Sequence, residues 1–373
     1  MENSSRLRIL YVLDSINYGS GVASVVMNYL RHINMDHFVF DVVVHKNSEP
    51  RLVREIESLG GNVYQLPDIN LRGFLSYRRA FGALLNDKKY TFIHGHIANA
   101  AFLYMKEAKH KQVPHRIIHS HNAQGASSVL KRIRNKILQH NIPRWSNHFF
   151  ACSDLAAEYL FGNRVDQRSV TIIPNAIDIN RFRFNVSERI LQRKALNIQE
   201  HTLCIGHIGR FDPQKNHTFL IRIFKEILNM HPDTCLVLAG GGTLETAIRQ
   251  QADELGVIDH ILFQGVVSNP AGLYQAFDVF LLPSLFEGWP VTGVEAQSMG
   301  LPCIFSDRIT KTAKILDQTE FLPIDDPTLW AAETLRLAGE SNREDRSEYV
   351  KEKGYDISEQ AKTLEALYLS FLG

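Results

Sequence analysis

Short apolar runs alternate with amphipathic stretches along almost the whole chain, and this alternation restricts the fold more than any other feature. Residues 8–13 form an apolar run, a glycine-containing loop follows, and residues 22–33 then show helical spacing. Strand and helix patterns that alternate at this distance predict βαβ units and a parallel sheet. Further strands of this first series are expected at residues 38–44, 63–66, 92–93, 116–118, 149–151 and 170–173.

The same pattern starts again after a polar stretch. An apolar run at residues 203–209 is followed by others at 235–239, 261–263, 279–282 and 302–305. Residues 178–201 are polar and charged, and we interpret them as a linker with a short helix. A chain of 373 residues exceeds what one hydrophobic core usually holds, which also favours two domains.

We therefore predict an α/β protein with two doubly wound, Rossmann-like domains. The first spans residues 1–185 and the second residues 186–356, and a final helix at about 357–373 is expected to pack back on the first domain. Doubly wound sheets bind ligands at the carboxyl ends of their strands. The expected binding site is a central cleft across which the two domains face each other.

Charge is balanced over the whole chain, at a formal net charge of +1, but one stretch is strongly basic. Residues 108–153 contain no Asp or Glu and carry eight Lys and Arg side chains. One basic island in a neutral chain favours a single anionic contact surface and no general nucleic-acid affinity. Within it, residues 129–138 plot as an amphipathic helix. Two interpretations stay open: the helix lies on an anionic membrane surface, or its apolar side faces the core.

Location is inferred from what the sequence lacks. The first eight residues have no long apolar core, and no window approaches the roughly 18 apolar residues of a membrane-spanning helix. The four cysteines are scattered and have apolar neighbours, which favours buried free thiols in a reducing compartment. We expect a cytoplasmic protein that is peripheral on the inner face of the cell membrane if the basic helix binds lipid.

The strongest motif lies at residues 284–296, directly after an apolar run. Glu287 and Glu295 stand eight residues apart and bracket Gly288 and Pro290, of which the proline suits the first position of a helix. A loop followed by a helix N-terminus is an anion site, and a carboxylate that accepts paired hydroxyls holds a ribose or hexose. The competing interpretation is that Glu287 caps the helix and Glu295 is a solvated surface residue.

This segment resembles the E-x7-E signature of glycosyltransferase family 4, which groups retaining enzymes of the GT-B fold. Residues 209–216 resemble the family's G-R-x-x-x-x-K-N segment, and residues 239–242 its glycine-rich turn. Residues 174–178 resemble its N-G-I-D turn, with Ala176 in place of the usual glycine. The amino-acid sequence of residues 295–307 is most similar to the corresponding segment of bacterial exopolysaccharide and capsule enzymes.

The resemblance implies a nucleotide-sugar donor site, with UDP as the nucleotide, that works without a metal cofactor. Arg210 and Lys215 would grip the diphosphate, a role that the fork of Arg donors and the compact charge of Lys suit. No convincing D-x-D metal motif is present. The implied donor-binding residues are Gly21, Arg210, Lys215, Glu287, Gly288, Trp289, Pro290, Val291 and Glu295.

Histidines and glycines of the first domain supply the rest of the expected site. Gly19 and Gly21 follow the first strand, where glycine lets the backbone approach a phosphate or sugar. His121 matches a family histidine close to the reacting sugar, and it joins Arg210, Lys215 and Glu287 as a catalytic candidate. His96 and Asn122 are expected on the acceptor side, with Gly19.

The implied function is transfer of a hexosyl or N-acetylhexosaminyl group to a growing, lipid-linked bacterial polysaccharide. Three alternatives are weighed. A sugar-nucleotide epimerase or hydrolase of related fold is disfavoured by the paired glutamates together with the two cations. A silent nucleotide-sugar-binding subunit is disfavoured because neither motif is lost. A dinucleotide-dependent oxidoreductase is disfavoured because Ser24 occupies the place of the third glycine in G-x-G-x-x-G.

Overall fold

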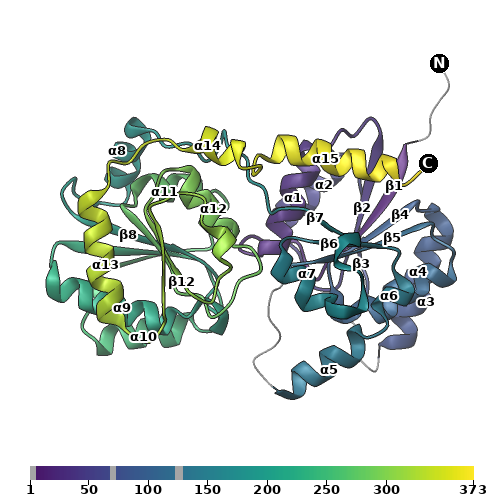
Figure 1. Cartoon of the computed structure of the whole chain (residues 1–373), viewed down its shortest axis with the longest axis horizontal. Coiled ribbons are helices and arrows are strands. Elements are labelled where there is room, and N and C mark those ends of the chain that lie inside the picture. Colours follow the sequence, from purple (N-terminus) through teal and green to yellow (C-terminus); the bar gives the residue numbers. More distant parts are fainter. Residues whose placement is uncertain (1–5, 68–72, 122–128) are drawn as a thin grey trace. The chain divides into compact units, whose positions relative to one another are not determined.

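The computed structural model describes residues 6–67, 73–121 and 129–373 and folds into two compact units. The N-terminal unit comprises Met1–Pro174 together with Ser358–Gly373, and the C-terminal unit comprises Asn175–Ile357. Residues 175–185, which the sequence analysis put in the first domain, thus belong to the second unit. The chain leaves the N-terminal unit once and returns to it for its last helix (Figure 1).

The N-terminal unit is built on a parallel sheet with the strand order β3-β2-β1-β4-β5-β6-β7. Every pairing between these strands in the described residues is parallel, as the alternating pattern predicts. The strands are β1 (Leu7–Val12), β2 (Phe38–Val44), β3 (Val63–Gln65), β4 (Phe92–Gly95), β5 (His115–Ser120), β6 (His148–Ala151) and β7 (Val170–Ile172).

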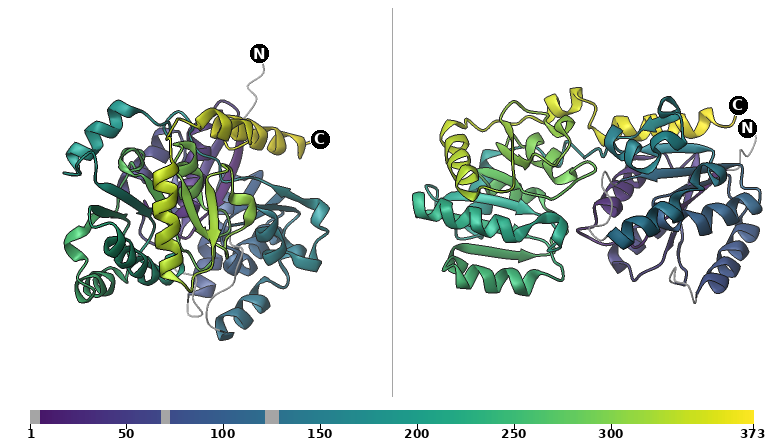
Figure 2. Two further views of the ribbon diagram at one scale, coloured as in Figure 1. Left: turned by 60° about the vertical axis from the view of Figure 1, so that its left-hand side comes forward. Right: turned by 60° about the horizontal axis from the view of Figure 1, so that its bottom comes forward.

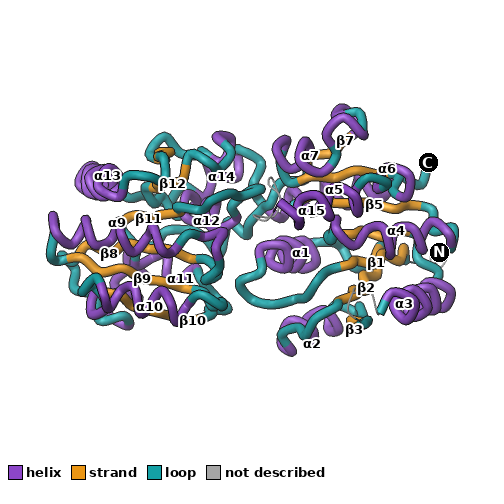
Figure 3. Tube along the Cα trace, turned by 90° about the horizontal axis from the view of Figure 1, so that it is seen from below, coloured by secondary structure: helices purple, strands orange, loops and turns teal. Residues whose placement is uncertain are grey.

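Helices cover both faces of this sheet, as a doubly wound fold requires (Figure 3). Those made before the chain crosses to the second unit are α1 (Gly21–His32), α2 (Pro50–Ser58), α3 (Phe74–Lys88), α4 (Ala101–His110), α5 (Val129–Gln139), α6 (Ile142–Trp145) and α7 (Asp154–Leu160). The last helix of the chain, α15 (Ile357–Ser370), completes the unit.

Helix α15 is held to the N-terminal unit by buried aromatic contacts. Tyr368 is fully buried, and its hydroxyl lies 2.9 Å from the hydroxyl of Tyr11 on β1 and 2.6 Å from Nδ1 of His94 on β4. Phe371, just beyond the helix, stacks on His148 with a ring-centre distance of 3.7 Å. Two further views show the helix lying along this unit (Figure 2). The end of the chain therefore packs on strands that lie far apart in the sequence.

The C-terminal unit repeats the architecture with the strand order β10-β9-β8-β11-β12-β13, again with parallel pairings throughout the described strands. Its strands are β8 (Leu203–Ile208), β9 (Thr234–Ala239), β10 (Ile261–Gly265), β11 (Val279–Leu282), β12 (Cys303–Ser306) and β13 (Thr319–Leu322). Its helices are α8 (Val186–Ala195), α9 (His217–Met230), α10 (Glu245–Glu254), α11 (Ala271–Ala276), α12 (Val291–Ser298), α13 (Pro327–Glu340) and α14 (Ser347–Glu352). The core includes Trp330, whose ring meets Phe219 edge-on.

Residues 178–201 contain the short helix that the sequence predicted, α8. Arg193 is 4% exposed and contacts Asp278 Oδ2 at 3.2 Å, and Arg189 forms a short ion pair with the other oxygen of the same carboxylate. The arginines also donate to backbone carbonyls at the end of α11. Two of the charges of this stretch therefore hold α8 to the rest of the C-terminal unit.

Strand order locates the ligand-binding end of each unit. In the N-terminal unit the order reverses between β1 and β4, and in the C-terminal unit it reverses between β8 and β11. At such a switch point the loops leaving the two central strands diverge and open a crevice at their carboxyl ends. The loops after β1, β4, β8 and β11 carry most of the residues singled out from the sequence.

Candidate active site

The loop between β11 and α12 carries the first of the two spaced glutamates. Glu287 is 7% exposed, so it is neither a solvated residue nor a cap of α12. The N-cap of that helix is Pro290, which has extended backbone angles, and the helix begins at Val291. The prediction of Pro290 as the first helical residue is thus wrong by one position. No side chain among the described residues caps this helix.

Glu287 is bound by two neighbouring residues of the loop after β8. Lys215 Nζ donates to Glu287 Oε1 at 2.7 Å, and Gln214 Nε2 lies 3.3 Å from Oε2. Gln214 also donates to the carbonyl of Phe286, and its own carbonyl accepts from the N–H of Leu285. The loops that leave the two central strands of the C-terminal unit are therefore joined through side chains and backbone.

Local backbone geometry places Lys215 for this contact. Asp212 accepts the N–H of Lys215 at 3.2 Å and so caps the 3₁₀ turn Pro213–Lys215. Asn216 follows in the left-handed region, at φ 55°, and donates to the carbonyl of Pro283 at 3.2 Å. Asparagine tolerates that conformation better than most residues. The G-R-x-x-x-x-K-N pattern thus encodes a turn as well as charges.

Arg210 lies on the same loop but is placed differently. Its side chain is 53% exposed and pairs with Asp212 at 3.0 Å. Lys215, by contrast, is 14% exposed and pairs with Glu287. The loop thus presents one accessible guanidinium beside one nearly buried ammonium. Sequence reasoning assigned no role to Asp212 or Gln214, although both lie inside the motif that carried the resemblance.

The glycine-rich turn after β9 packs backbone to backbone on the loop after β8. Gly240 has φ 148°, and a Cβ there would fall 2.0 Å from the carbonyl oxygen of Gly209. A Cβ on Gly242 would meet the carbonyl oxygen of Phe211 at 2.4 Å. These two positions need glycine because the neighbouring loop occupies the space of any side chain. The turn is a support for the loop of Arg210 and Lys215.

Glu295, the second glutamate, lies inside α12 and is 8% exposed. Tyr274 of α11 donates its hydroxyl proton to Glu295 Oε2 at 2.8 Å. Burial raises the pKa of Glu295 to about 7, while the hydrogen bond from Tyr274 and the charge of Arg181 act in the opposite direction. The carboxyl group is therefore poised to change protonation near neutral pH. Nothing in the sequence pattern pointed to Tyr274.

The loop between the glutamates is fixed by residues distant in sequence. Asn175 Nδ2 donates to the carbonyl of Trp289 at 3.1 Å, and the Trp289 ring stacks on Tyr355 at 5.3 Å. Gly288 lies in the same loop, before Pro290. Asn175 belongs to the N-G-I-D-like turn, whose Ala176 is fully buried. The turn matched at the domain junction therefore positions the glutamate loop within the C-terminal unit.

In the N-terminal unit, the glycines after β1 have different roles. Gly19 has φ 76°, a conformation that favours glycine, and Ser20 caps α1 by accepting the N–H of Ala23 at 3.5 Å. Gly21 is the first residue of α1, and a Cβ built on it meets nothing within 4 Å. Packing thus does not require glycine at position 21, which leaves open space at the helix N-terminus.

Histidines gather at the carboxyl ends of β4 and β5. His96 Nδ1 lies 2.7 Å from His121 Nε2, so the catalytic candidate and the acceptor-side candidate form one pair. Burial lowers the pKa of His121 to about 4, which keeps its ring neutral at physiological pH. His94 and His119 stack against this pair. Asn122 lies outside the described residues.

Comparisons with known proteins match both units. Residues 19–181 match the family described as Glycosyltransferase Family 4, and residues 188–353 match the one described as Glycosyl transferases group 1. EpsF of Bacillus subtilis, whose name describes a glycosyltransferase, is 32% identical to this chain and covers 98% of it, over 97% of its own length. The chain belongs to glycosyltransferase family 4. The family resemblance seen in the sequence is confirmed.

Other relatives match in part or in fold. The Escherichia coli UDP-Gal:alpha-D-GlcNAc-diphosphoundecaprenol alpha-1,3-galactosyltransferase is 33% identical over 146 residues, 38% of either chain. Anabaena Alr3699/HepE, solved in complex with UDP-glucose, aligns with a TM-score of 0.80 at 15% identity, over 98% of this chain and 100% of that one. WaaG, a glycosyltransferase involved in lipopolysaccharide biosynthesis, aligns with a TM-score of 0.71 at 13% identity, over 95% of each chain. The predicted GT-B fold is confirmed, and the protein is a GT-B glycosyltransferase related to polysaccharide-building enzymes.

A helix that spans a bilayer must be both long and apolar. None of the helices in the described ranges is long and apolar enough to cross a membrane.

Proposed function

We propose that the protein is a retaining glycosyltransferase that transfers a hexosyl or N-acetylhexosaminyl group from a UDP-sugar to a growing, lipid-linked bacterial polysaccharide. The observation that carries this proposal is the nearly buried Lys215–Glu287 pair, with Arg210 exposed on the same loop. It lies at the switch point between β8 and β11, where a doubly wound sheet binds nucleotides. One loop thus offers cations to a diphosphate and a carboxylate to a sugar.

The donor site is proposed to work without a metal cofactor. The leaving group is a nucleoside diphosphate, whose growing negative charge must be stabilised for the bond to break. Arg210 is accessible for a bidentate contact with phosphate oxygens, and Lys215 adds a compact charge beside it. The N-terminus of α12, which no described side chain caps, adds favourable backbone dipoles. Together these groups stabilise the negative charge that a divalent cation stabilises in other transferases.

The two glutamates are assigned different roles within the donor site. Glu295 accepts hydroxyls of the ribose, as a carboxylate held by one tyrosine still has acceptor capacity to spare. Glu287 positions the donor sugar and stabilises the positive charge of an oxocarbenium-like transition state. Its oxygens are engaged by Lys215 and Gln214, so a nucleophilic attack by Glu287 is disfavoured. Gly288, Trp289 and Pro290 of the loop and Val291, the first residue of α12, line the donor site.

Retention of the anomeric configuration is proposed from the family resemblance, with no carboxylate assigned as a nucleophile. We propose a displacement on one face of the sugar, in which the leaving phosphate accepts the proton of the acceptor hydroxyl. In the N-terminal unit, the neutral His121 ring donates a hydrogen bond to a sugar hydroxyl, and His96 fixes its orientation. Gly21 leaves open space at the start of α1 for a ligand, and Gly19 supplies the positive φ of the turn before it. The anomeric configuration of the product, read by NMR, decides between retention and inversion.

UDP is proposed as the nucleotide on the basis of the relatives. HepE was solved with UDP and with UDP-glucose, and the name of the Escherichia coli relative specifies UDP-Gal and a diphosphoundecaprenol acceptor. These statements concern those proteins. They make UDP-sugars the first donors to test and an undecaprenyl-linked saccharide the first acceptor.

Thermal shift with a panel of nucleotide sugars in the presence of EDTA tests the donor site. We expect one UDP-sugar to raise the melting temperature selectively, and we expect Glu295→Ala and Arg210→Ala to lose the shift. Arg336→Ala, at an exposed ion pair on α13, is the matched control and should keep the shift. Selective binding without transfer to any acceptor would favour the silent nucleotide-sugar-binding subunit, and the absence of a shift with every nucleotide sugar and with UDP would contradict the proposed donor site. Hydrolysis or epimerisation of the donor without acceptor would indicate the other enzyme class.

Helix α5 supports the proposal of a membrane-bound acceptor. Its apolar residues Leu130, Ile133 and Ile137 are 79%, 53% and 69% exposed, whereas Asn135 and Gln139 are buried. Gln139 Nε2 donates to Asn99 Oδ1 at 2.6 Å. The helix therefore turns its polar side to the protein and its apolar side outward, which contradicts the interpretation of a core-facing apolar side.

Basic residues accompany that outward apolar side. Arg134 and Lys136 are exposed, and residues 131 and 132 are also basic. An exposed apolar stripe flanked by positive charge suits the headgroup region of an anionic bilayer. We propose that α5 holds the protein on the inner face of the cell membrane as a cytoplasmic, peripheral protein, near a lipid-linked acceptor.

A further inference from the structure

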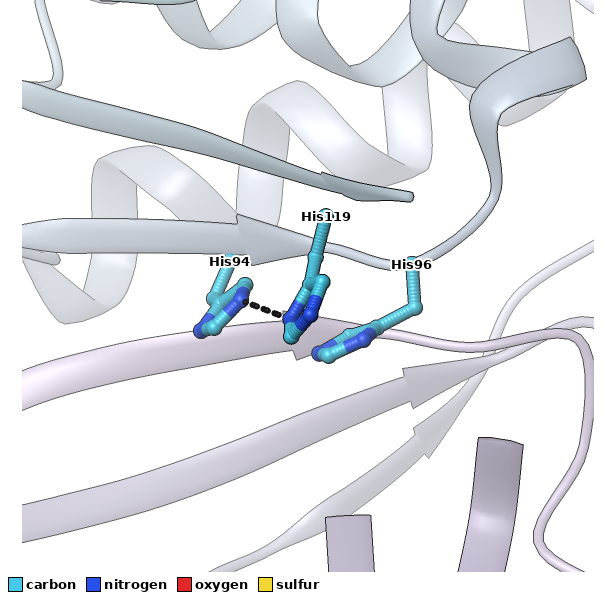
Figure 4. Close-up of side chains that lie close together, drawn as sticks. All are labelled: His94, His96 and His119. Atoms are coloured by element: carbon cyan, nitrogen blue, oxygen red, sulfur yellow. Dashed lines mark hydrogen bonds between the residues drawn. The ribbon is translucent and has the colours of Figure 1, made fainter. Parts of the chain in front are cut away.

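Three imidazoles from two neighbouring strands meet on one side of the N-terminal sheet. His94 lies on β4, His96 follows it by two residues, and His119 lies on β5 (Figure 4). Residues two apart on an extended chain point to the same side, and adjacent parallel strands bring those sides together. One ring nitrogen from each histidine can be chosen so that the three lie within 4.8 Å of one another. We propose that His94, His96 and His119 bind a divalent transition-metal ion of the zinc class.

The spacing of two of these nitrogens already suits one metal ion. His94 Nε2 lies 3.2 Å from His119 Nδ1, drawn as a dashed line in Figure 4. Two imidazoles on a tetrahedral zinc ion, each at roughly 2.0–2.1 Å, have their nitrogens about 3.3 Å apart. The ion would take the place of the hydrogen bond, and the two rings, whose centres lie 5.3 Å apart at an interplanar angle of 15°, would turn so that both lone pairs point at it. His96, the least buried of the three, is the ring that must move closer.

Partners on the far side of the rings match the environment of a metal ligand. A histidine that binds a metal through one nitrogen usually donates its other N–H to a neighbouring group, which fixes the ring and its tautomer. His94 Nδ1 lies 2.6 Å from the Tyr368 hydroxyl, and His96 Nδ1 lies 2.7 Å from His121 Nε2. Two of the three rings thus have Nδ1 engaged, which leaves Nε2 as the atom that would bind the ion.

One further buried ring nitrogen of the cluster is left without a partner. His96 Nε2 has no hydrogen-bond partner in the described residues. A buried polar atom without a partner costs free energy, which a bound ion or water would recover. Neutral imidazole suits zinc, cobalt and nickel ions.

The proposed ion is separate from donor binding. The three histidines lie in the N-terminal unit, whereas Arg210, Lys215 and both glutamates lie in the C-terminal unit. Three histidines leave a fourth coordination position open, as in metal sites that keep a bound water. The inference does not rest on the proposed transfer reaction, since metal binding is measured without donor or acceptor. Each of the two proposals can fail without the other.

Cobalt titration of the chelator-treated full-length protein tests the site. Tetrahedral Co²⁺ absorbs visible light, and equilibrium dialysis gives the stoichiometry. We expect one Co²⁺ per chain, displaced by Zn²⁺. His96→Gln and His119→Gln should each weaken Co²⁺ binding by at least about 100-fold. Loss of a residue that hydrogen-bonds a metal ligand typically lowers metal affinity by about 10–100-fold, and loss of the ligand itself should cost at least as much. Should His119→Gln fail to fold, the less buried His96→Gln carries the test.

Two further variants separate a metal site from incidental histidine binding. Tyr368→Phe removes the partner of His94 Nδ1 and should weaken Co²⁺ binding by roughly 10–100-fold. His115→Gln is the matched control, because His115 Nδ1 lies 3.1 Å from His148 Nε2 and these two rings do not belong to the cluster of three histidines. It should leave Co²⁺ binding unchanged. The proposal is overturned if the protein takes up no stoichiometric Co²⁺, which is the result expected when water molecules form the missing hydrogen bonds to the rings. It is also overturned if Co²⁺ uptake is equal in His96→Gln and the unaltered protein.

Discussion

Lys215 Nζ donates to Glu287 Oε1 across 2.7 Å, which joins the loop after β8 to the loop after β11. Their side chains are 14% and 9% exposed, so each charge depends on the other for compensation. A donor diphosphate that approaches Lys215 meets an ammonium already oriented by Glu287. The pair is thus both a structural tie and a preorganised part of the proposed donor site.

Replacing Lys215 by alanine should lower turnover more than donor affinity. In the proposed mechanism the lysine stabilises charge that grows on the leaving diphosphate, and removal of one preorganised group of that kind costs about 100–1,000-fold in kcat. Steady-state kinetics with the best nucleotide sugar measure the effect, with Arg336→Ala as the control. Unchanged kcat in Lys215→Ala would remove the residue from the proposed mechanism.

Glu295→Ala should raise the donor KM strongly. The carboxylate is the proposed acceptor of ribose hydroxyls, and a charge-assisted hydrogen bond is worth about 1.5–3 kcal/mol. The loss corresponds to roughly 10–150-fold in KM. Tyr274→Phe, which leaves the carboxylate in place but removes its donor, should have a smaller effect on KM. Equal donor KM values for Glu295→Ala and the unaltered protein would contradict the assignment.

Donor binding should weaken as the pH falls through about 7. The pKa of Glu295 is raised to about 7, so its carboxyl takes up a proton in that range and loses the charge that holds the ribose hydroxyls. Glu295→Gln should show a high KM that no longer depends on pH between 6 and 8. A pH profile that stays the same in the Gln variant would assign the dependence to another group.

The same pKa shift should act on stability in the opposite direction. Because the folded pKa lies above the unfolded value of 4.5, the contribution is fully present below that value and is lost as the pH rises through 7. The full effect is on the order of 3 kcal/mol. Urea unfolding of the unaltered protein and of Glu295→Gln at pH 5 and pH 8 measures the difference. We expect the Gln variant to gain relative stability at the higher pH.

Gly240→Ala should weaken both the fold and the donor site. The added methyl group would meet the carbonyl of Gly209 at 2.0 Å, so the loop that leads to Arg210 must shift. Gly265→Ala is the matched control, because Gly265 also has positive φ but open space around its Cβ. The control should lose only about 1–2 kcal/mol for the backbone conformation. A melting temperature for Gly240→Ala equal to that of the control would argue against the clash.

Replacing Ile133 and Ile137 by serine should reduce binding to anionic vesicles. Both side chains are largely exposed on α5, and burying them in the headgroup region is the proposed source of affinity. Exchange of the four basic residues at 131, 132, 134 and 136 for Gln should act in the same direction. Leu75→Ser, at an exposed leucine of α3, is the control. Unchanged co-sedimentation of both α5 variants with anionic vesicles would contradict the proposal that α5 binds the membrane.

The sequence predicted the two parallel sheets because their signal is local. Strand β11 is a continuous apolar run, β2 is interrupted only by Asp41, and the loops after β8 and β11 carry recognisable motifs. The contact of His94 with Tyr368 spans 274 positions, and no local pattern predicts which strand a terminal helix will cover. Asp278 and Tyr274 were missed for the same reason.

Charge patterns were harder to interpret than apolar ones. The arginines of α8 were placed in a linker with a short helix and given no role, whereas in the structure they contact Asp278 and backbone carbonyls. On α5, the amphipathic pattern was recognised, but the pattern alone does not say which side faces the protein. That was decided by the contact of Gln139 with Asn99, a partner 40 residues away.

The return of α15 to the N-terminal unit sets an order for biosynthesis. A ribosome makes residues 1–174 first, yet Tyr368, which covers Tyr11 and His94, is polymerised only after the 183 residues of the C-terminal unit. At about 5–20 residues per second, that interval is roughly 10–40 seconds. During it, the nascent N-terminal sheet keeps part of its aromatic core uncovered, so the segment translated first is the one that matures last.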